Sequence, residues 1–155
     1  MTAADLLTGT GVVPGIAYAP AGWARKPPQV PVDTRIIAEA DRAAETERFR
    51  AAAETVAARF AARASAATGA ASEVLAATAT LAEDRGWIRT ATRQIGAGKP
   101  ATTATAEAIA KFVSQFEKLG GLMAERTTDL KDIRDRVIAE ILGLPEPGVP
   151  QPDQP

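Results

Sequence analysis

The sequence contains no cysteine and no histidine among its 155 residues. Without cysteine there is no disulfide framework, no thiolate nucleophile and no sulfur-ligated metal site. Without histidine the chain lacks the usual general base at neutral pH, the commonest metal ligand and any site for a phosphohistidine. We therefore expect no catalytic group, no metal and no cofactor on the chain itself, and a cytoplasmic location.

Two further absences limit the possible partners. The chain has 18 basic and 19 acidic residues and a net charge of −1, so no general field favours nucleic acid or an anionic membrane. No apolar run approaches the roughly 20 residues that a membrane-spanning helix needs, and the start lacks the pattern of a signal peptide. A chain of this length is expected to form one domain with a substantial core.

Most of the sequence carries helical patterns, with alanine, glutamate and arginine as frequent residues. Asp33 is a candidate N-cap for a long first helix, and Asp84 is a candidate N-cap for a short one. Gly120 and Gly121 are expected to end one amphipathic helix and turn the chain into the last one. The expected helices cover residues 33–67, 72–82, 85–95, 101–119 and 122–142.

The two ends of the sequence differ from this helical part. The run GTGVVPGIAYAPAGWA contains a Pro14-Gly15 turn followed by an extended pattern, which predicts one or two short strands. Five prolines in the last eleven residues exclude a helix or a central strand there. The expected organisation is an N-terminal strand segment and linker over residues 1–32, a helical domain over 33–143 and a linker over 144–155. The predicted fold class is mainly α: a helical bundle or claw of four main helices and one short helix, with a short N-terminal β segment and a proline-rich tail.

The apolar stripe of the long first helix changes direction along its length. At about 100° per residue, the apolar residues of the first half point roughly 170° away from those of the second half. Either the helix bends, or its two halves are buried against different partners. The two sets are Ile36, Ile37, Ala40 and Ala44, and Phe49, Ala53, Val56 and Phe60.

The last predicted helix, LMAERTTDLKDIRDRVIAEIL, combines an apolar stripe with a dense polar face. Asp129, Asp132 and Asp135 recur at three-residue spacing, which is compatible with metal ligands. Arginine and lysine residues alternate with them, however, so the pattern favours a solvated face of salt bridges.

Three blocks of the sequence, in order, resemble Enzyme I of the phosphoenolpyruvate:sugar phosphotransferase system. They are GTGVVPGIAYAPA, VLAATATLAEDRGWI and GGLMAERTTDLKDIRDRVIAEILG. The last block is similar to the family signature ERAADxRDIxxR and is the most specific of the three.

The resemblance implies a bacterial helical subdomain that docks the phosphocarrier protein HPr during sugar transport. In that family the subdomain is inserted into an α/β domain bearing the active histidine, and a Mg-dependent barrel that forms the homodimer follows. The missing histidine and the proline tail suggest a chain that stops before these parts. The implied partners are HPr and the rest of Enzyme I in cis, and the chain alone is expected to be monomeric and non-catalytic, with Mg required only by the parent phosphotransferase.

Carried over by motif, HPr docking falls on the two short helices and the start of the last one. The candidate contacts are Val74, Ala77, Thr80, Leu81, Asp84 and Trp87, with Met123, Arg126 and Asp129 across the claw. For Trp87 an equally good interpretation is a residue that covers a small core beneath its helix. Arg126 and Asp129 could instead form a salt bridge on the helix surface.

The second block departs from the family at positions that are often acidic or histidine, where this chain has Ala76, Thr78, Arg85 and Gly86. This predicts a smaller electrostatic share in docking and a weaker dependence on salt. Two alternatives remain: an Enzyme I-like module of another phosphoryl-transfer protein, such as a dihydroxyacetone kinase subunit, or a helical scaffold or regulator without a phosphotransfer partner.

Overall fold

The computed structural model describes residues 14–16, 27 and 33–148. The described part contains helices and no strand, which confirms the mainly α fold. The predicted N-terminal strands lie almost wholly outside the described residues, as does the end of the proline tail. The elements are η1 (Glu39–Asp41), α1 (Arg42–Ala66), α2 (Ala70–Ala82), α3 (Arg85–Gly96), α4 (Ala101–Leu119), α5 (Gly121–Glu125) and α6 (Thr127–Ile141).

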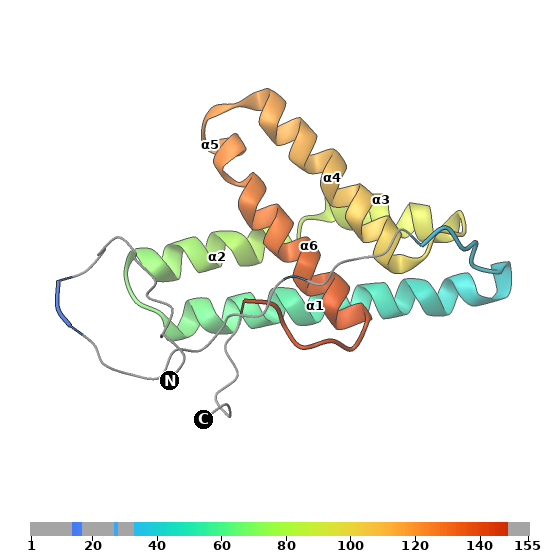
Figure 1. Cartoon of the computed structure of the whole chain (residues 1–155), viewed down its shortest axis with the longest axis horizontal. Helices are drawn as coiled ribbons and strands as arrows, with labels where there is room; N and C mark the ends of the chain where they lie inside the picture. Colours follow the sequence, from blue (N-terminus) through green and yellow to red (C-terminus); the bar gives the residue numbers. More distant parts are fainter. Residues whose placement is uncertain (1–13, 17–26, 28–32, 149–155) are drawn as a thin grey trace, which may run out of the picture.

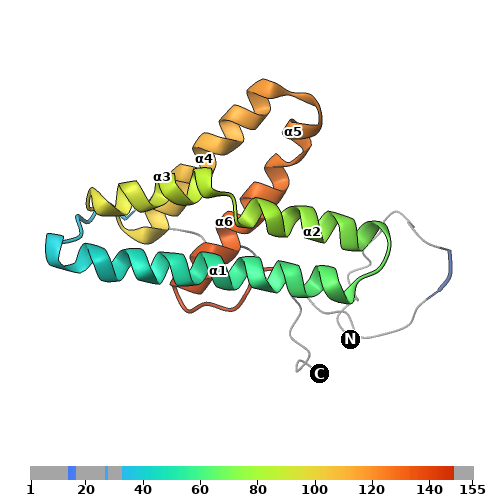
Figure 2. The ribbon, with the colours of Figure 1, turned by 180° about the vertical axis from the view of Figure 1, so that it is seen from behind.

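The long helix α1 forms the base of the molecule (Figures 1 and 2). Helix α2 packs along its C-terminal half and α3 along its N-terminal half. Helix α4 packs on α3 and α6, and α6 crosses back over α1. The C-terminal end of α4 and the whole of α5 project beyond this body, and we call them the arm.

The core lies where α1, α3, α4 and α6 meet. Its largest side chains are Phe49 of α1 and Trp87 of α3, which are fully buried and contact each other edge to face with ring centroids 5.9 Å apart. Buried alanines of α1, including Ala53 and Ala57, lie in the same core and allow the helices to approach closely. The same core contains the aliphatic residues Val56, Ile95, Ile109, Leu130, Ile133 and Val137.

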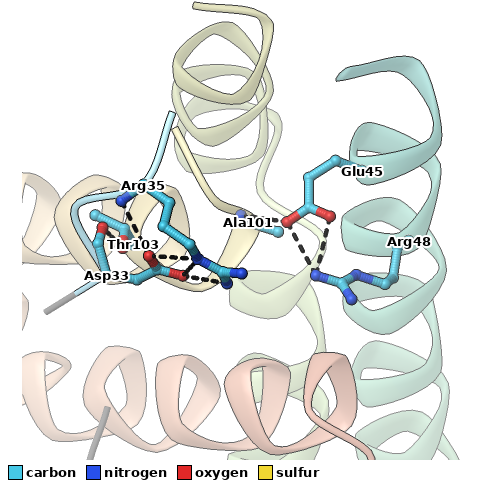
Figure 3. A network of polar contacts seen from close by, with 6 residues as sticks. All are labelled: Asp33, Arg35, Glu45, Arg48, Ala101 and Thr103. Atoms are coloured by element: carbon cyan, nitrogen blue, oxygen red, sulfur yellow. Dashed lines mark hydrogen bonds and ion pairs between the residues drawn. The ribbon is translucent and has the colours of Figure 1, made fainter. Parts of the chain in front are cut away.

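The start of the first helix differs from the prediction. Residues 33–38 are not helical, and α1 begins at Arg42 after a short 3-10 turn. The residue that precedes α1 is Asp41, so Asp33 is not its N-cap; the carboxylate of Asp33 is paired with Arg35 at 2.7 Å instead (Figure 3). The segment follows the loop before α4 instead, where Ile37 N–H donates to the carbonyl of Gly98 at 2.8 Å. Ile36 and Ile37 therefore lie in a loop and not in the helix. The change in stripe direction predicted for a single long helix arises largely because its first residues are not helical.

The first turn of α4 is bonded to a side chain of α1. Pro100 precedes α4 and supplies no side-chain cap. The Oε1 atom of Glu45 accepts a hydrogen bond from the backbone N–H of Ala101 at 2.8 Å, and Arg48 pairs with the same carboxylate at 2.9 Å (Figure 3). A carboxylate at a helix N-terminus also interacts favourably with the helix dipole. Glu45 therefore fixes the start of α4 against α1.

The predicted last helix is divided in two at Arg126, between α5 and α6. The hydroxyl of Thr127 donates to the carbonyl of Ala124 at 2.8 Å and so competes for a backbone acceptor at the junction. The turn before α5 is made by Gly120 and Gly121 with φ of +71° and +56°, a conformation that favours glycine.

Part of the predicted C-terminal linker contacts the helices, through Glu146 and the buried Pro147. Glu146 accepts a hydrogen bond from Arg63 of α1 at 2.7 Å and another from Arg136 of α6. Burial by itself raises the pKa of Glu146, but these two arginines outweigh it and hold the pKa below the ordinary value of 4.5. Arg136 also lies over the ring of Phe60, 5.2 Å from its centroid.

Candidate functional site

The apolar stripe of α4 continues beyond the core into the arm. Ile109 and Val113 are buried, whereas Phe112, next to Val113, and Phe116, one turn further along the helix, are half-buried. Leu119, the last residue of α4, is 70% exposed. The stripe therefore leaves apolar surface uncovered at the end of the helix.

Helix α5 adds two more exposed apolar side chains at the same end of the arm. Leu122 is 80% exposed and Met123 is 48% exposed. We call Leu119, Leu122 and Met123 the arm tip. A group of large apolar side chains on a projecting element is typical of an interaction site. Of the three, only Met123 was among the residues predicted from the sequence.

Helix α2 carries the other half of the predicted contacts. Val74 is 54% exposed, Thr80 is exposed, and Ala77 and Leu81 are half-buried. Helix α2 contacts α6, and α5 lies over the α2 half of the long helix in both views (Figures 1 and 2). Helices α2 and α5 thus lie toward the same end of α1.

Asp84 lies at the junction of α2 and α3, where it is the N-cap of α3 as predicted. Its exposed carboxylate accepts a hydrogen bond from Gly86 N–H at 2.8 Å. Helix α4 approaches closely here, because a Cβ on Gly86 would lie 2.7 Å from the ring of Phe112 and 2.8 Å from Asp84 Oδ1. Only glycine fits this position without displacing a neighbour.

Trp87 is not part of the accessible surface, so its prediction as a direct partner contact is wrong. Its side chain is fully buried against Phe49, and its indole Nε1–H donates to the carbonyl of Leu81 at 3.1 Å. The alternative interpretation, a core residue beneath the short helix, is the correct one.

Arg126 and Asp129 form an ion pair with each other at 3.0 Å and remain partly exposed. Asp132 pairs with Arg136 at 2.8 Å, and Asp135 pairs with Arg134 at 2.7 Å. The three regularly spaced carboxylates are therefore members of salt bridges. Within the described residues no group of three or more acidic side chains is arranged to hold a metal ion.

Sequence reasoning missed Leu119 and Leu122. Leu119 belongs to the apolar stripe of α4, and the stripe by itself does not show that α6 covers only its first part. Leu122 follows the Gly120-Gly121 turn. An apolar residue directly after a turn between two helices could have been predicted to be exposed. No helix in the described part of the chain is long and apolar enough to cross a membrane.

Comparison with known proteins agrees with this architecture. The family described as PEP-utilising enzyme, N-terminal, matches residues 8–126. A phosphoenolpyruvate-protein phosphotransferase of Streptomyces coelicolor is 37% identical over 149 residues, which cover 96% of this chain and 27% of that protein. One of Haloferax volcanii is 50% identical over 44 residues, 28% of this chain and 8% of that protein.

Two solved structures have the same helical arrangement. The solution structure of Enzyme I (nEIt) matches with a TM-score of 0.64 and 26% identity over 75% of this chain and 49% of that one. The N-terminal domain of Enzyme 1 - Nitrogen matches with a TM-score of 0.59 and 26% identity over 66% of this chain and 45% of that one. This chain spans about a quarter of the length of its Streptomyces relative and about half of each solved structure. The chain belongs to the PEP-utilising enzyme family and corresponds to an N-terminal region of Enzyme I.

Proposed function

We propose that this chain is the part of an Enzyme I that docks the phosphocarrier protein HPr. The observation that carries the proposal is the uncovered apolar surface on the arm tip, over the half of the molecule where α2 exposes Val74. Apolar side chains at the centre of an interface exclude water and supply most of its binding energy. Docking places the histidine of HPr near the active histidine of the parent enzyme, which this chain lacks.

The charges near this surface favour docking that depends mainly on apolar contacts. Arg126 and Asp129 neutralise each other across 3.0 Å, and Asp84 is bonded to the start of α3. Of the proposed contact residues, only these three are charged. We therefore expect the affinity for HPr to change little with ionic strength, because screening acts on charged and not on apolar contacts.

The parent protein would be a phosphoenolpyruvate-protein phosphotransferase, as its relatives are named. Its Mg²⁺, its phosphoenolpyruvate site and its dimer interface would belong to parts outside this chain. The side chains described above contribute binding and orientation to the phosphoryl transfer and no proton transfer of their own.

The test is a titration of ¹⁵N-labelled HPr with this chain, followed by NMR. We expect shifts around the active histidine of HPr, and we expect Val74→Lys or Met123→Lys to weaken binding at least about tenfold, since each places a charge in an apolar interface. Ile36→Lys is the matched control, because Ile36 is 82% exposed and lies in the loop before α1, away from this surface.

Trp87→Ala is unsuitable as a docking variant, because it removes a core residue. If HPr shows no shifts with a chain that is folded by circular dichroism, the proposal is wrong and a helical scaffold or regulator is favoured. Equal weakening by Ile36→Lys would show that the binding does not use the arm tip and α2.

A further inference from the structure

Three cations surround a hollow between α3 and α4, which begins at Gly86, next to the proposed docking contact Asp84. Arg89 and Arg93 lie one turn apart on α3, and Lys111 faces them from α4. The hollow has a volume of about 370 Å³. Its lining consists of Gly86, Arg89, Thr90, Arg93, Lys111, Phe112 and Gln115. We call it the cationic hollow.

No carboxylate lines the cationic hollow. Arg89, Arg93 and Lys111 are exposed, and none forms an ion pair with another residue of the described part of the chain. The nearest acidic side chain on α4, Glu107, is one turn from Lys111 and is paired with Lys99. The three cations of the lining are therefore unpaired within the described residues, and the adjacent carboxylate of Asp84 is bonded to Gly86 N–H at 2.8 Å.

The same region carries further positive charge on its other side. Arg85, one turn before Arg89 on α3, lines a second hollow together with Arg89 and with Arg50 of α1, which is paired with Glu47 at 3.3 Å. Like charges held close together repel one another, and a bound anion relieves that repulsion. The arrangement favours an anion at Arg89, which is shared by the two hollows.

The floor of the cationic hollow is apolar. Phe112 is half-buried, and its ring packs so closely on Gly86 that a Cβ there would lie 2.7 Å away. The Oγ1 of Thr90 is engaged with the carbonyl of Gly86 at 2.9 Å, so the free polar donors are the two guanidinium groups, the ammonium group and the Gln115 amide. Planar guanidinium groups suit the bidentate recognition of phosphate oxygens.

From this geometry we infer that the cationic hollow binds a small organic phosphate, its phosphate held by Arg89, Arg93 and Lys111 and its carbon part lying on Phe112. The volume is at the lower end of the range for small-molecule sites, and three cations are enough to neutralise the charge of about −2 on a phosphate monoester. A concave site of this size favours a small ligand over the flat acidic face of a protein. This inference is independent of HPr docking.

The test uses phenyl phosphate and inorganic phosphate as probes, titrated into the ¹⁵N-labelled full chain at about 0.15 M salt. We expect saturable shifts at residues 86–93 and 111–115, with a dissociation constant for phenyl phosphate below about 1 mM and weaker binding of inorganic phosphate. Arg89→Gln with Arg93→Gln should weaken phenyl phosphate binding at least about tenfold, since each loses a charge-assisted hydrogen bond.

The matched control is Lys118→Gln with Lys131→Gln, which removes the same charge from two exposed lysines outside the hollow. It should change the affinity less than about twofold, because screened charges at a distance contribute little. Equal weakening by both double variants would show non-specific ion binding and overturn the inference. So would the absence of saturable shifts, or tighter binding of a polyglutamate peptide than of phenyl phosphate. If the arginine variant does not fold, Lys111→Gln serves as the second variant, with the same expected direction.

Discussion

Replacing Glu45 by alanine should loosen the attachment of α4 to α1, because this side chain of α1 caps the first turn of α4. In the wild type, its carboxylate accepts the Ala101 N–H at 2.8 Å in a part-buried position, and Pro100 offers no substitute. Loss of a helix cap costs about 1–2 kcal/mol, and loss of a negative charge at a helix N-terminus adds about 0.3–1 kcal/mol. The pair with the exposed Arg48 contributes a few tenths at most. The expected cost of Glu45→Ala is therefore about 2 kcal/mol.

Two further variants separate the parts of this estimate. Glu45→Gln keeps an acceptor for the Ala101 N–H but removes the charge, so it should cost only about 0.5–1 kcal/mol. Arg48→Gln removes the ion pair alone and should cost less than about 0.5 kcal/mol.

Urea unfolding followed by circular dichroism gives all three differences in the free energy of unfolding. The reasoning would be refuted if Glu45→Ala cost less than about 0.5 kcal/mol, or if Arg48→Gln cost as much as Glu45→Ala. The first result would mean that the cap is not formed in solution, and the second would place its energy in the ion pair.

Gly86→Ala should destabilise the fold by about 1 kcal/mol, because the cost of overpacking and of displacing the Asp84 cap exceeds the gain in helix propensity. Gly96→Ala is the control, because Gly96 lies in the same helix with open space around it, and this variant should be neutral or stabilising. Equal effects in urea unfolding would contradict this. Glu146→Gln should cost about 1–2 kcal/mol near pH 7. Because the folded-state pKa of Glu146 is the lowered one, its stabilisation is present above the ordinary value of 4.5 and is lost as the pH falls through the folded-state value. The difference between wild type and Glu146→Gln should therefore shrink below about pH 4.5, and a constant difference down to about pH 3 would contradict the assignment.

Helix ends were predicted correctly where they are set by residues close by in the sequence. Asp84 caps α3 as expected, and the bounds of α4 agree with its apolar stripe and the Gly120-Gly121 turn. The predicted start of α1 was wrong, because this end is set by a residue far away in the sequence. Residues 33–38 leave the helix because Ile37 finds a backbone partner in Gly98, about sixty residues later, and no local pattern reports such a contact.

The candidate site was only partly predictable, because a pattern shows that a residue is apolar and not what covers it. Trp87 heads a short helix and looks equally suitable for a core or for an interface. Its burial depends on Phe49, a residue of α1 that only the folded chain brings against it. Leu119 is the reverse case, since it continues a core stripe but lies beyond the helices that cover the stripe.

The separation between body and arm has a consequence for stability and binding. The body buries its large side chains among alanines of α1, so its stability depends on residues such as Phe49 and Trp87 that no partner can touch. The arm tip contributes little to that core, because Leu119 and Leu122 are largely exposed and Met123 is about half exposed. Substitutions at the arm tip should therefore change binding and leave the free energy of unfolding within about 0.5 kcal/mol of wild type. The proposed docking of HPr would account for large apolar residues that add so little to the fold.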